Sequence, residues 1–282
     1  MLEKLLKYEF KATGRVFLPL YAGLIAAAVI AYFALRTDIE IINILSGLLL
    51  GALYVALVII TIVLLIQRFY QSLLRDEGYL MFTLPVNPSL LIASKLISAF
   101  VWCILSMIAG AAAGLVASGS FFHISELFVL IAECMAEYPY VSVPGLLIML
   151  TICAGLASLV CTIVQVYFSL AVGQLPVFSK HRILFAILAF LGTSAILQIV
   201  AMISGSIMMP YFSRQFNTLN IMIDMNDPSP FFESAAYTEN FITELISAMN
   251  IFMLSALIFY AIFAAAMFIG TSLILKLKLN LE

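Results

Sequence analysis

The chain has 282 residues, of which 65% are hydrophobic and only 10% are charged. A soluble globular domain carries about 25% charged residues, so this composition excludes that class and indicates that lipid surrounds most of the chain. The net charge of −2 gives no basis for a nucleic-acid partner, and the distribution of charge between the apolar segments is more informative than its sum.

Residues 1–15 form a basic amphipathic segment. At helical spacing the apolar side chains share one face, and the opposite face carries the cations Lys4, Lys7, Lys11 and Arg15. This pattern predicts an interfacial helix in the plane of the membrane surface. Glu9 falls within the apolar face, and two interpretations are open. It reaches back to water, or it pairs with a cation of the first inner loop, Arg68 or Arg75.

Six apolar runs without Asp, Glu, Lys, Arg or His follow, each long enough to cross a hydrocarbon core that needs about 20 residues. They are residues 16–35, 41–66, 96–116, 144–170, 183–209 and 251–275. The first run is too long for the core of a signal peptide and is interpreted as an uncleaved span. The sequence therefore predicts an all-α polytopic membrane protein, a bundle of six transmembrane helices (residues 16–282) behind an N-terminal amphipathic interfacial helix (residues 1–15).

The distribution of Lys and Arg predicts the orientation of these spans. With both termini in the cytoplasm, two cations lie outside, Arg36 and Arg214. Eleven lie inside: Lys4, Lys7, Lys11, Arg15, Arg68, Arg75, Lys95, Lys180, Arg182, Lys276 and Lys278. Because cytoplasmic loops carry an excess of Lys and Arg, we expect a multi-pass protein of the cell membrane with both termini cytoplasmic.

The inner loop at residues 67–95 has the most distinctive sequence. Asp76 and Glu77 stand where the N-terminus of a helix favours negative charge, and Leu80 belongs to a partly apolar face that Pro85 ends. An element this short is unstable alone in water and needs a surface to dock against.

The motif Arg75-x-Glu77-Gly78-x-Leu80, followed by Leu84-Pro85-Val86 and Ser94-Lys95, resembles the first cytoplasmic loop of type-2 ABC transporter permeases. The resemblance extends to Tyr8-Glu9-Phe10, to the six-span layout and to the C-terminal residues 277–282. In that family the loop carries a coupling helix that sits in a groove of a separate ATPase subunit. The contact residues that the resemblance implies are Arg75, Asp76, Glu77, Gly78, Tyr79, Leu80, Leu84 and Pro85.

The resemblance also implies the assembly. Two permease subunits, identical or paralogous, would pair with two ATPase subunits that hold the ATP and Mg, so no cofactor is expected in this chain. It further implies short re-entrant helices at about residues 238–250, within the outer segment 210–250. An acidic surface loop is the alternative there. The other long outer segment, residues 117–143, is expected to form short helices that pack on the outer end of the bundle or dip into it.

Motifs for chemistry within the chain are missing from the sequence. No phosphate-binding Gly-x4-Gly-Lys-Ser/Thr motif, no His-Glu-x-x-His and no His/Cys cluster for a metal occurs. The spans carry no carboxylate for ion coupling and no catalytic set of polar groups. The favoured function is therefore not enzymatic: a permease subunit of an ABC exporter that moves a hydrophobic or amphipathic substrate, a peptide or a lipid-like compound. An ATP-independent membrane sensor, binding protein or carrier is the alternative.

Polar and small residues inside the spans leave further alternatives open. Gln165 and Gln198 either form interhelical hydrogen bonds or line a translocation path. The small residues from Gly110 to Gly114 allow close helix approach, either within one chain or at a subunit interface.

Overall fold

The computed structural model describes residues 2–37, 39–71, 88–119, 129, 144–175, 181–222 and 234–277. Within these ranges all regular structure is helical, and six helices are long and apolar enough to cross a membrane. They are α1 (Leu2–Ala34), α2 (Glu40–Phe69), α4 (Pro88–Ser118), α6 (Pro144–Gly173), α7 (Arg182–Met222) and α8 (Ser234–Leu277). The prediction of an all-α, multi-pass membrane protein with six spans is confirmed.

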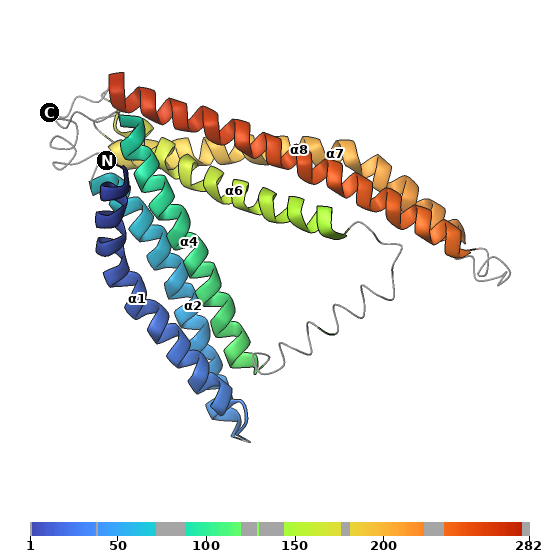
Figure 1. Cartoon of the computed structure of the whole chain (residues 1–282), viewed down its shortest axis with the longest axis horizontal. Coiled ribbons are helices and arrows are strands. Elements are labelled where there is room, and N and C mark those ends of the chain that lie inside the picture. The colour runs from blue at the N-terminus through green and yellow to red at the C-terminus, as the bar shows by residue number, and fades with distance from the viewer. Residues whose placement is uncertain are drawn as a thin grey trace.

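The helices form two halves of three that meet at one end and diverge toward the other (Figure 1). In the first half α1 packs against both α2 and α4, and in the second half α6 packs against both α7 and α8. The first turn of α1 and the last turn of α8 lie at the end where the halves meet, here called the joined end; the other is the open end. A single bundle was expected instead. Lipid solvates apolar helix faces as well as another helix does, so hydrophobicity alone does not force the halves together.

An apolar cluster at the joined end connects the two halves. Its buried members come from four helices: Phe69 of α2, Leu91, Ile92 and Ala99 of α4, Ile163 and Tyr167 of α6, and Leu275 of α8. The rings of Phe69 and Tyr167 stack with centroids 4.1 Å apart and planes 10° apart. Most contacts between the halves involve α2 and α4 on one side and α6 and α8 on the other.

Small residues bring the helices of the first half close together. Ala28 of α1 and Ala113 of α4 are fully buried in the core of this half. The hydroxyl of Tyr54 in α2 donates a hydrogen bond to the carbonyl of Gly110, and a Cβ at Gly114 would lie 3.1 Å from the same hydroxyl. The small residues of the third span thus serve packing within one chain.

The structure does not support a separate interfacial helix at residues 1–15. One helix continues from Leu2 to Ala34. Its first turns pack against α4 and the apolar cluster of the joined end, here called the joint, and do not lie apart from the spans. Leu5 contacts the apolar cluster of the joint, and Thr13 is buried at 4% exposure. The apolar face that suggested a membrane-surface helix is thus used for packing within the protein.

Two boundaries in the second half also differ from the sequence prediction. Helix α8 is continuous from Ser234, so residues 238–250 form neither an acidic loop nor a separate re-entrant helix. No Gly or Pro between residues 234 and 250 ends the helix there. Helix α7 passes the predicted end at residue 209 and reaches Met222. At about 1.5 Å per residue, α7 and α8 are both much longer than a hydrocarbon core of about 30 Å.

The inner loop is shorter than the predicted range of residues 67–95. Helix α2 ends at Phe69 and α4 begins at Pro88, so Ser94 and Lys95 are helical. Of the outer segment 117–143, the structure describes only residues 117–119 and Val129, and the expected short helices lie otherwise outside the described residues.

Candidate functional site

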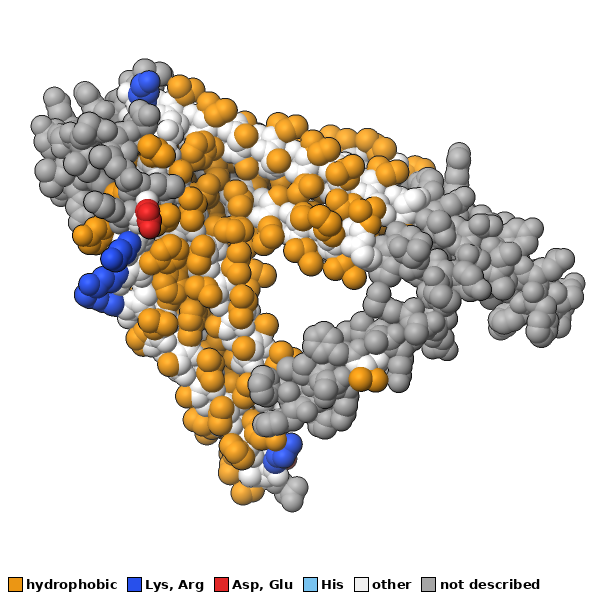
Figure 2. Space-filling model, in the orientation of Figure 1, with side chains coloured by type: hydrophobic (Ala, Val, Ile, Leu, Met, Phe, Trp, Pro, Cys, Tyr) orange, Lys and Arg blue, Asp and Glu red, His pale blue; other side chains and the backbone are white. Residues whose placement is uncertain are grey.

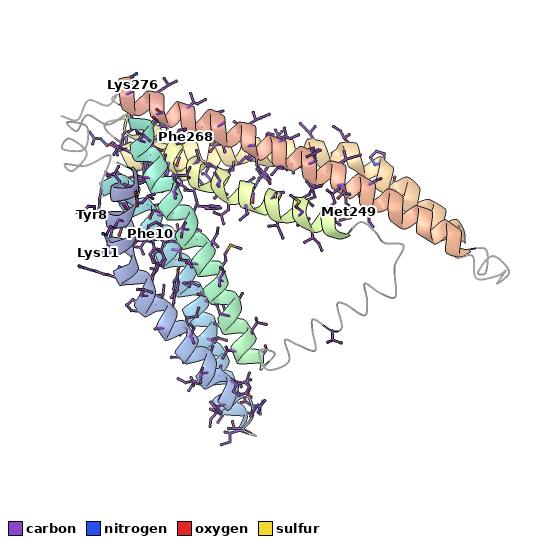
Figure 3. All side chains as sticks on the ribbon, in the orientation of Figure 1. Tyr8, Phe10, Lys11, Met249, Phe268 and Lys276 are labelled. Carbon is purple, nitrogen blue, oxygen red and sulfur yellow. The ribbon has the colours of Figure 1, made fainter. Side chains whose placement is uncertain are left out.

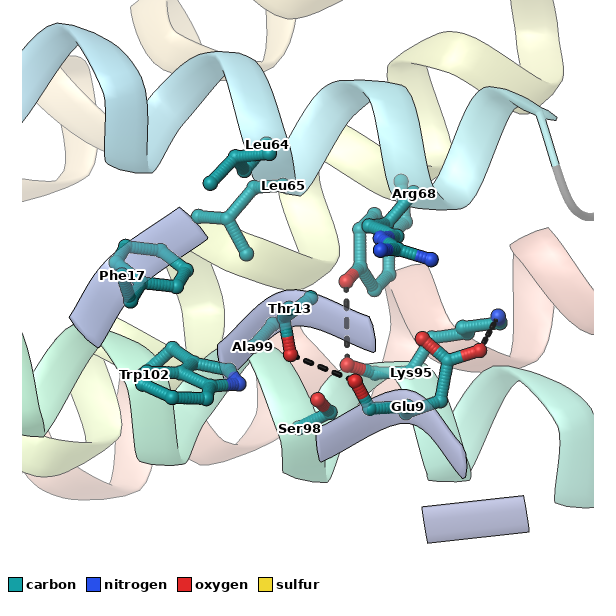
Figure 4. Close-up of a pocket in the computed structure, with 11 residues that line it drawn as sticks. Glu9, Thr13, Phe17, Leu64, Leu65, Arg68, Lys95, Ser98, Ala99 and Trp102 are labelled. Atoms are coloured by element: carbon teal, nitrogen blue, oxygen red, sulfur yellow. Dashed lines mark hydrogen bonds and ion pairs between the residues drawn. The ribbon is translucent and has the colours of Figure 1, made fainter. Parts of the chain in front are cut away.

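A buried polar cluster lies at the joined end, where α1, α2, α4 and α6 approach one another (Figure 4). It surrounds a cavity of about 20 Å³. Its charged and hydroxyl members are Glu9, Thr13, Arg68, Lys95, Ser98 and Tyr167. All of these except Tyr167 belong to the first half, so the cluster is built mainly by α1, α2 and α4.

An ion pair between Glu9 and Lys95 is the centre of this cluster. The carboxylate of Glu9 accepts a hydrogen bond from the ammonium group of Lys95, and the two side chains are 14% and 4% exposed. Removing a charge from water costs several kcal/mol, which an oppositely charged partner offsets. Each of these charges is therefore tolerated at this depth because the other is present.

The position of this pair follows from the parallel course of α1 and α4. Both helices start at the joined end, and Glu9 and Lys95 each stand seven residues after the first residue of their helix. Two interpretations of Glu9 were open, access to water or a pair with Arg68 or Arg75. A cation does pair with Glu9, but the partner that the structure gives is Lys95. Arg68 lines the same cavity, and Arg75 lies outside the described residues.

Aromatic rings close the cavity on the side of α1 and α4. Phe17 stacks on Trp102 with ring centroids 4.6 Å apart and planes 11° apart. The indole N–H of Trp102 is buried, and no described residue accepts a hydrogen bond from it. The adjacent cavity is large enough for one water molecule, since about 10–15 Å³ suffices.

Tyr167 links the cluster to the second half. Its hydroxyl donates a hydrogen bond of 3.4 Å to the carbonyl of Lys95, while its ring stacks on Phe69. Lys95 therefore contacts α1 through its side chain and α6 through its backbone. Helix α4, which follows the inner loop, therefore contacts α1 of its own half and α6 of the other half.

The two glutamines of the predicted spans have different environments in the structure. Gln165 of α6 is 3% exposed, and its amide donates hydrogen bonds to the hydroxyls of Ser194 and Thr193 in α7, at 2.7 and 3.1 Å. These are the interhelical bonds of the first interpretation. Gln198 lies on α7 and is exposed.

The residues expected to contact an ATPase all lie outside the described residues: Arg75, Asp76, Glu77, Gly78, Tyr79, Leu80, Leu84 and Pro85. The structure does describe both flanks of their loop. Helix α2 ends and α4 begins at the joined end, which also carries exposed cations on other helices. Lys11 of α1 and Lys276 of α8 are labelled there in Figure 3.

Sequence reasoning missed Trp102 and Tyr167 as parts of this cluster. The only tryptophan of the chain and a tyrosine within the fourth span were weak signals, because a large aromatic residue in a span is usually core or lipid-facing. Within the described part of the chain, no group of three or more His, Cys, Asp or Glu side chains could hold a metal ion.

Comparison with known proteins gives no matching family model, no matching curated protein and no matching solved structure.

Proposed function

We propose that this chain is the membrane-spanning permease subunit of an ABC exporter, driven from the joined end by a separate ATPase subunit. The observation that carries the proposal is the anchoring of both flanks of the inner loop. Phe69, at the end of α2, stacks on Tyr167 of α6, and Lys95, near the start of α4, pairs with Glu9 of α1. A force applied at either described flank of the loop would thus pass along a helix to contacts with both halves.

In this proposal the joined end is the cytoplasmic end of a cell-membrane protein. The loop between α2 and α4 docks on the ATPase, and ATP and Mg are held by that partner. A second copy or a paralogue of this chain completes the transporter. Closure of the ATPases pushes on α2 and α4 and changes the angle between the halves.

The surfaces of the two halves support the proposed substrate class. The flanks of the opening between them are mostly apolar among the side chains drawn, and the charged side chains gather at the ends (Figure 2). Such walls suit a hydrophobic or amphipathic molecule, a peptide or a lipid-like compound, better than a small ion.

Purification of the tagged, full-length chain from its native membrane tests the proposal. We expect Mg-dependent ATP hydrolysis to co-purify with the wild-type chain and to be lost with Gly78→Pro or Leu80→Asp. Ile39→Asp is the matched control, because Ile39 is 54% exposed in the link between α1 and α2, at the open end. This control should retain the ATPase.

Two results would contradict the assignment. An ATPase that stays bound after deletion of residues 76–86 would exclude the loop as the coupling element. A wild-type chain that purifies from its native membrane without any ATP-hydrolysing subunit would favour the alternative, an ATP-independent sensor, binding protein or carrier.

A further inference from the structure

A groove at the joined end lies between the last turn of α2 and the first two turns of α7. Its volume is about 780 Å³. Tyr70 borders it from the first half, and residues 181–184, 187 and 188 border it from the second. It is separate from the buried ion pair, which lies among α1, α2, α4 and α6.

Polar side chains border the groove at the start of α7, and apolar side chains border it further along that helix. His181 and Arg182 are exposed and stand where the apolar span of α7 begins. Ile183, Leu184, Ile187 and Leu188 follow, between 51% and 75% exposed. Their spacing places them on one face of the helix, over roughly 9 Å of its length. The guanidinium of Arg182 and the imidazole of His181 therefore stand at the polar end of the apolar stretch of α7, next to an apolar wall.

We propose that this groove binds an anionic phospholipid. Its phosphate would lie against Arg182 and His181, and its upper acyl chains would lie along Ile183, Leu184, Ile187 and Leu188. The argument for this occupant is charge complementarity. Apolar helix faces gain little from replacing lipid tails by protein, whereas a cation near the membrane surface strengthens the binding of an anionic lipid about fivefold.

The size of the groove agrees with such a ligand. About 780 Å³ lies within the range of about 300–1,000 Å³ that is typical of small-molecule sites. This volume admits a headgroup with the first part of its acyl chains.

The bound lipid would touch both halves beside the joint. Tyr70 directly follows Phe69, whose ring stacks on Tyr167, so the groove opens next to the contact that holds the halves together. A ligand that binds only the folded, joined arrangement stabilises it by mass action. The lipid is thus a structural ligand of the joint, and this role does not depend on the proposed ATPase.

Native mass spectrometry of the purified full-length chain tests the proposal, with phosphatidylglycerol and phosphatidylcholine of identical acyl chains as probes. We expect the wild-type chain to retain phosphatidylglycerol in preference to phosphatidylcholine. The double variant His181→Gln/Arg182→Gln should bind phosphatidylglycerol at least about fivefold more weakly. Lys11→Gln/Arg15→Gln is the matched control, since it neutralises two exposed cations of α1 that do not line the groove.

A second variant probes the apolar wall without changing charge. Ile187→Trp fills part of the groove, and we expect it to reduce retention of phosphatidylglycerol while thermal unfolding of the lipid-free protein stays within a few degrees of wild type. Equal losses in the groove variant and the Lys11/Arg15 control would overturn the proposal, because they would indicate general surface attraction. Unchanged retention in both groove variants, or equal retention of the two lipids by the wild-type chain, would also overturn it.

Discussion

The ring of Phe69 in α2 stacks on the ring of Tyr167 in α6, and this pair lies in the apolar cluster that connects the two halves of the molecule. Both side chains are almost fully buried, at 0% and 2% exposure. The same tyrosine donates a hydrogen bond to the carbonyl of Lys95. Tyr167 of the second half therefore contacts both the last residue of α2 and the start of α4.

Removal of the Tyr167 ring should weaken the joint severely. Tyr167→Ala deletes a buried aromatic ring and leaves a cavity, so we expect the free energy of unfolding to fall by about 3–5 kcal/mol. Tyr167→Phe keeps the ring and loses one long hydrogen bond, so its cost should stay near 1 kcal/mol. Equilibrium unfolding in detergent measures both. Tyr8→Ala is the control, because Tyr8 is 74% exposed; a loss for Tyr167→Ala no larger than for this control would contradict the assignment of the joint.

The Glu9–Lys95 pair should behave as one unit. Glu9→Gln leaves the ammonium group of Lys95 buried without its counter-charge, and we expect a loss of about 3 kcal/mol in unfolding free energy. Lys95→Met should restore part of this loss when it is combined with Glu9→Gln, because the unpaired charge is then gone. A double-mutant cycle measures the coupling, expected at about 1–3 kcal/mol. A cycle between Glu9→Gln and Arg15→Gln, an exposed cation on the same helix, serves as the control. Additive effects in the Glu9–Lys95 cycle would show that the pair contributes nothing.

Gly173 should tolerate no side chain, because α6 and α7 approach each other there. A Cβ at Gly173 would lie 2.6 Å from the carbonyl oxygen of Arg182 and 2.8 Å from the Cβ of Ala186, so Gly173→Ala must displace the start of α7. We expect this variant to lose about 1–3 kcal/mol of unfolding free energy. Gly155→Ala in α6 is the matched control, since nothing lies within 4 Å of a Cβ there. It should be neutral or stabilising by up to about 1 kcal/mol, from the higher helix propensity of alanine. Equal effects of the two substitutions would contradict this packing.

The orientation of the chain can be tested by labelling single cysteines in a variant that lacks its four natural ones. Thr37 and Lys11 are both exposed, the first in the link after α1 and the second on the first turns of α1. Because the excess of cations predicts a cytoplasmic joined end, Thr37→Cys should react with a membrane-impermeant maleimide in intact cells. Lys11→Cys should react only after the cells are permeabilised. The reverse pattern would invert the topology and remove the loop at residues 67–95 from the cytoplasm.

Much of the architecture was predictable because it is a local property of the chain. A run of about 20 apolar residues must satisfy its backbone hydrogen bonds internally in lipid, so each of the six runs becomes a helix whatever its neighbours are. Helix ends were less predictable. Residues 1–15 have the pattern of a surface helix and residues 238–250 that of a separate outer segment, yet each continues into the adjacent span.

The sequence by itself determined the number of membrane-spanning helices and their approximate position, since hydropathy acts on each segment separately. Only the tertiary structure decided that the spans divide into two halves, that Glu9 pairs with Lys95, and that Gln165 bonds to α7 while Gln198 is exposed. These outcomes depend on which helices become neighbours and in what register. Lipid solvates every apolar face almost equally, so composition does not determine which helices become neighbours. Buried ion pairs, stacked rings and small residues determine it instead.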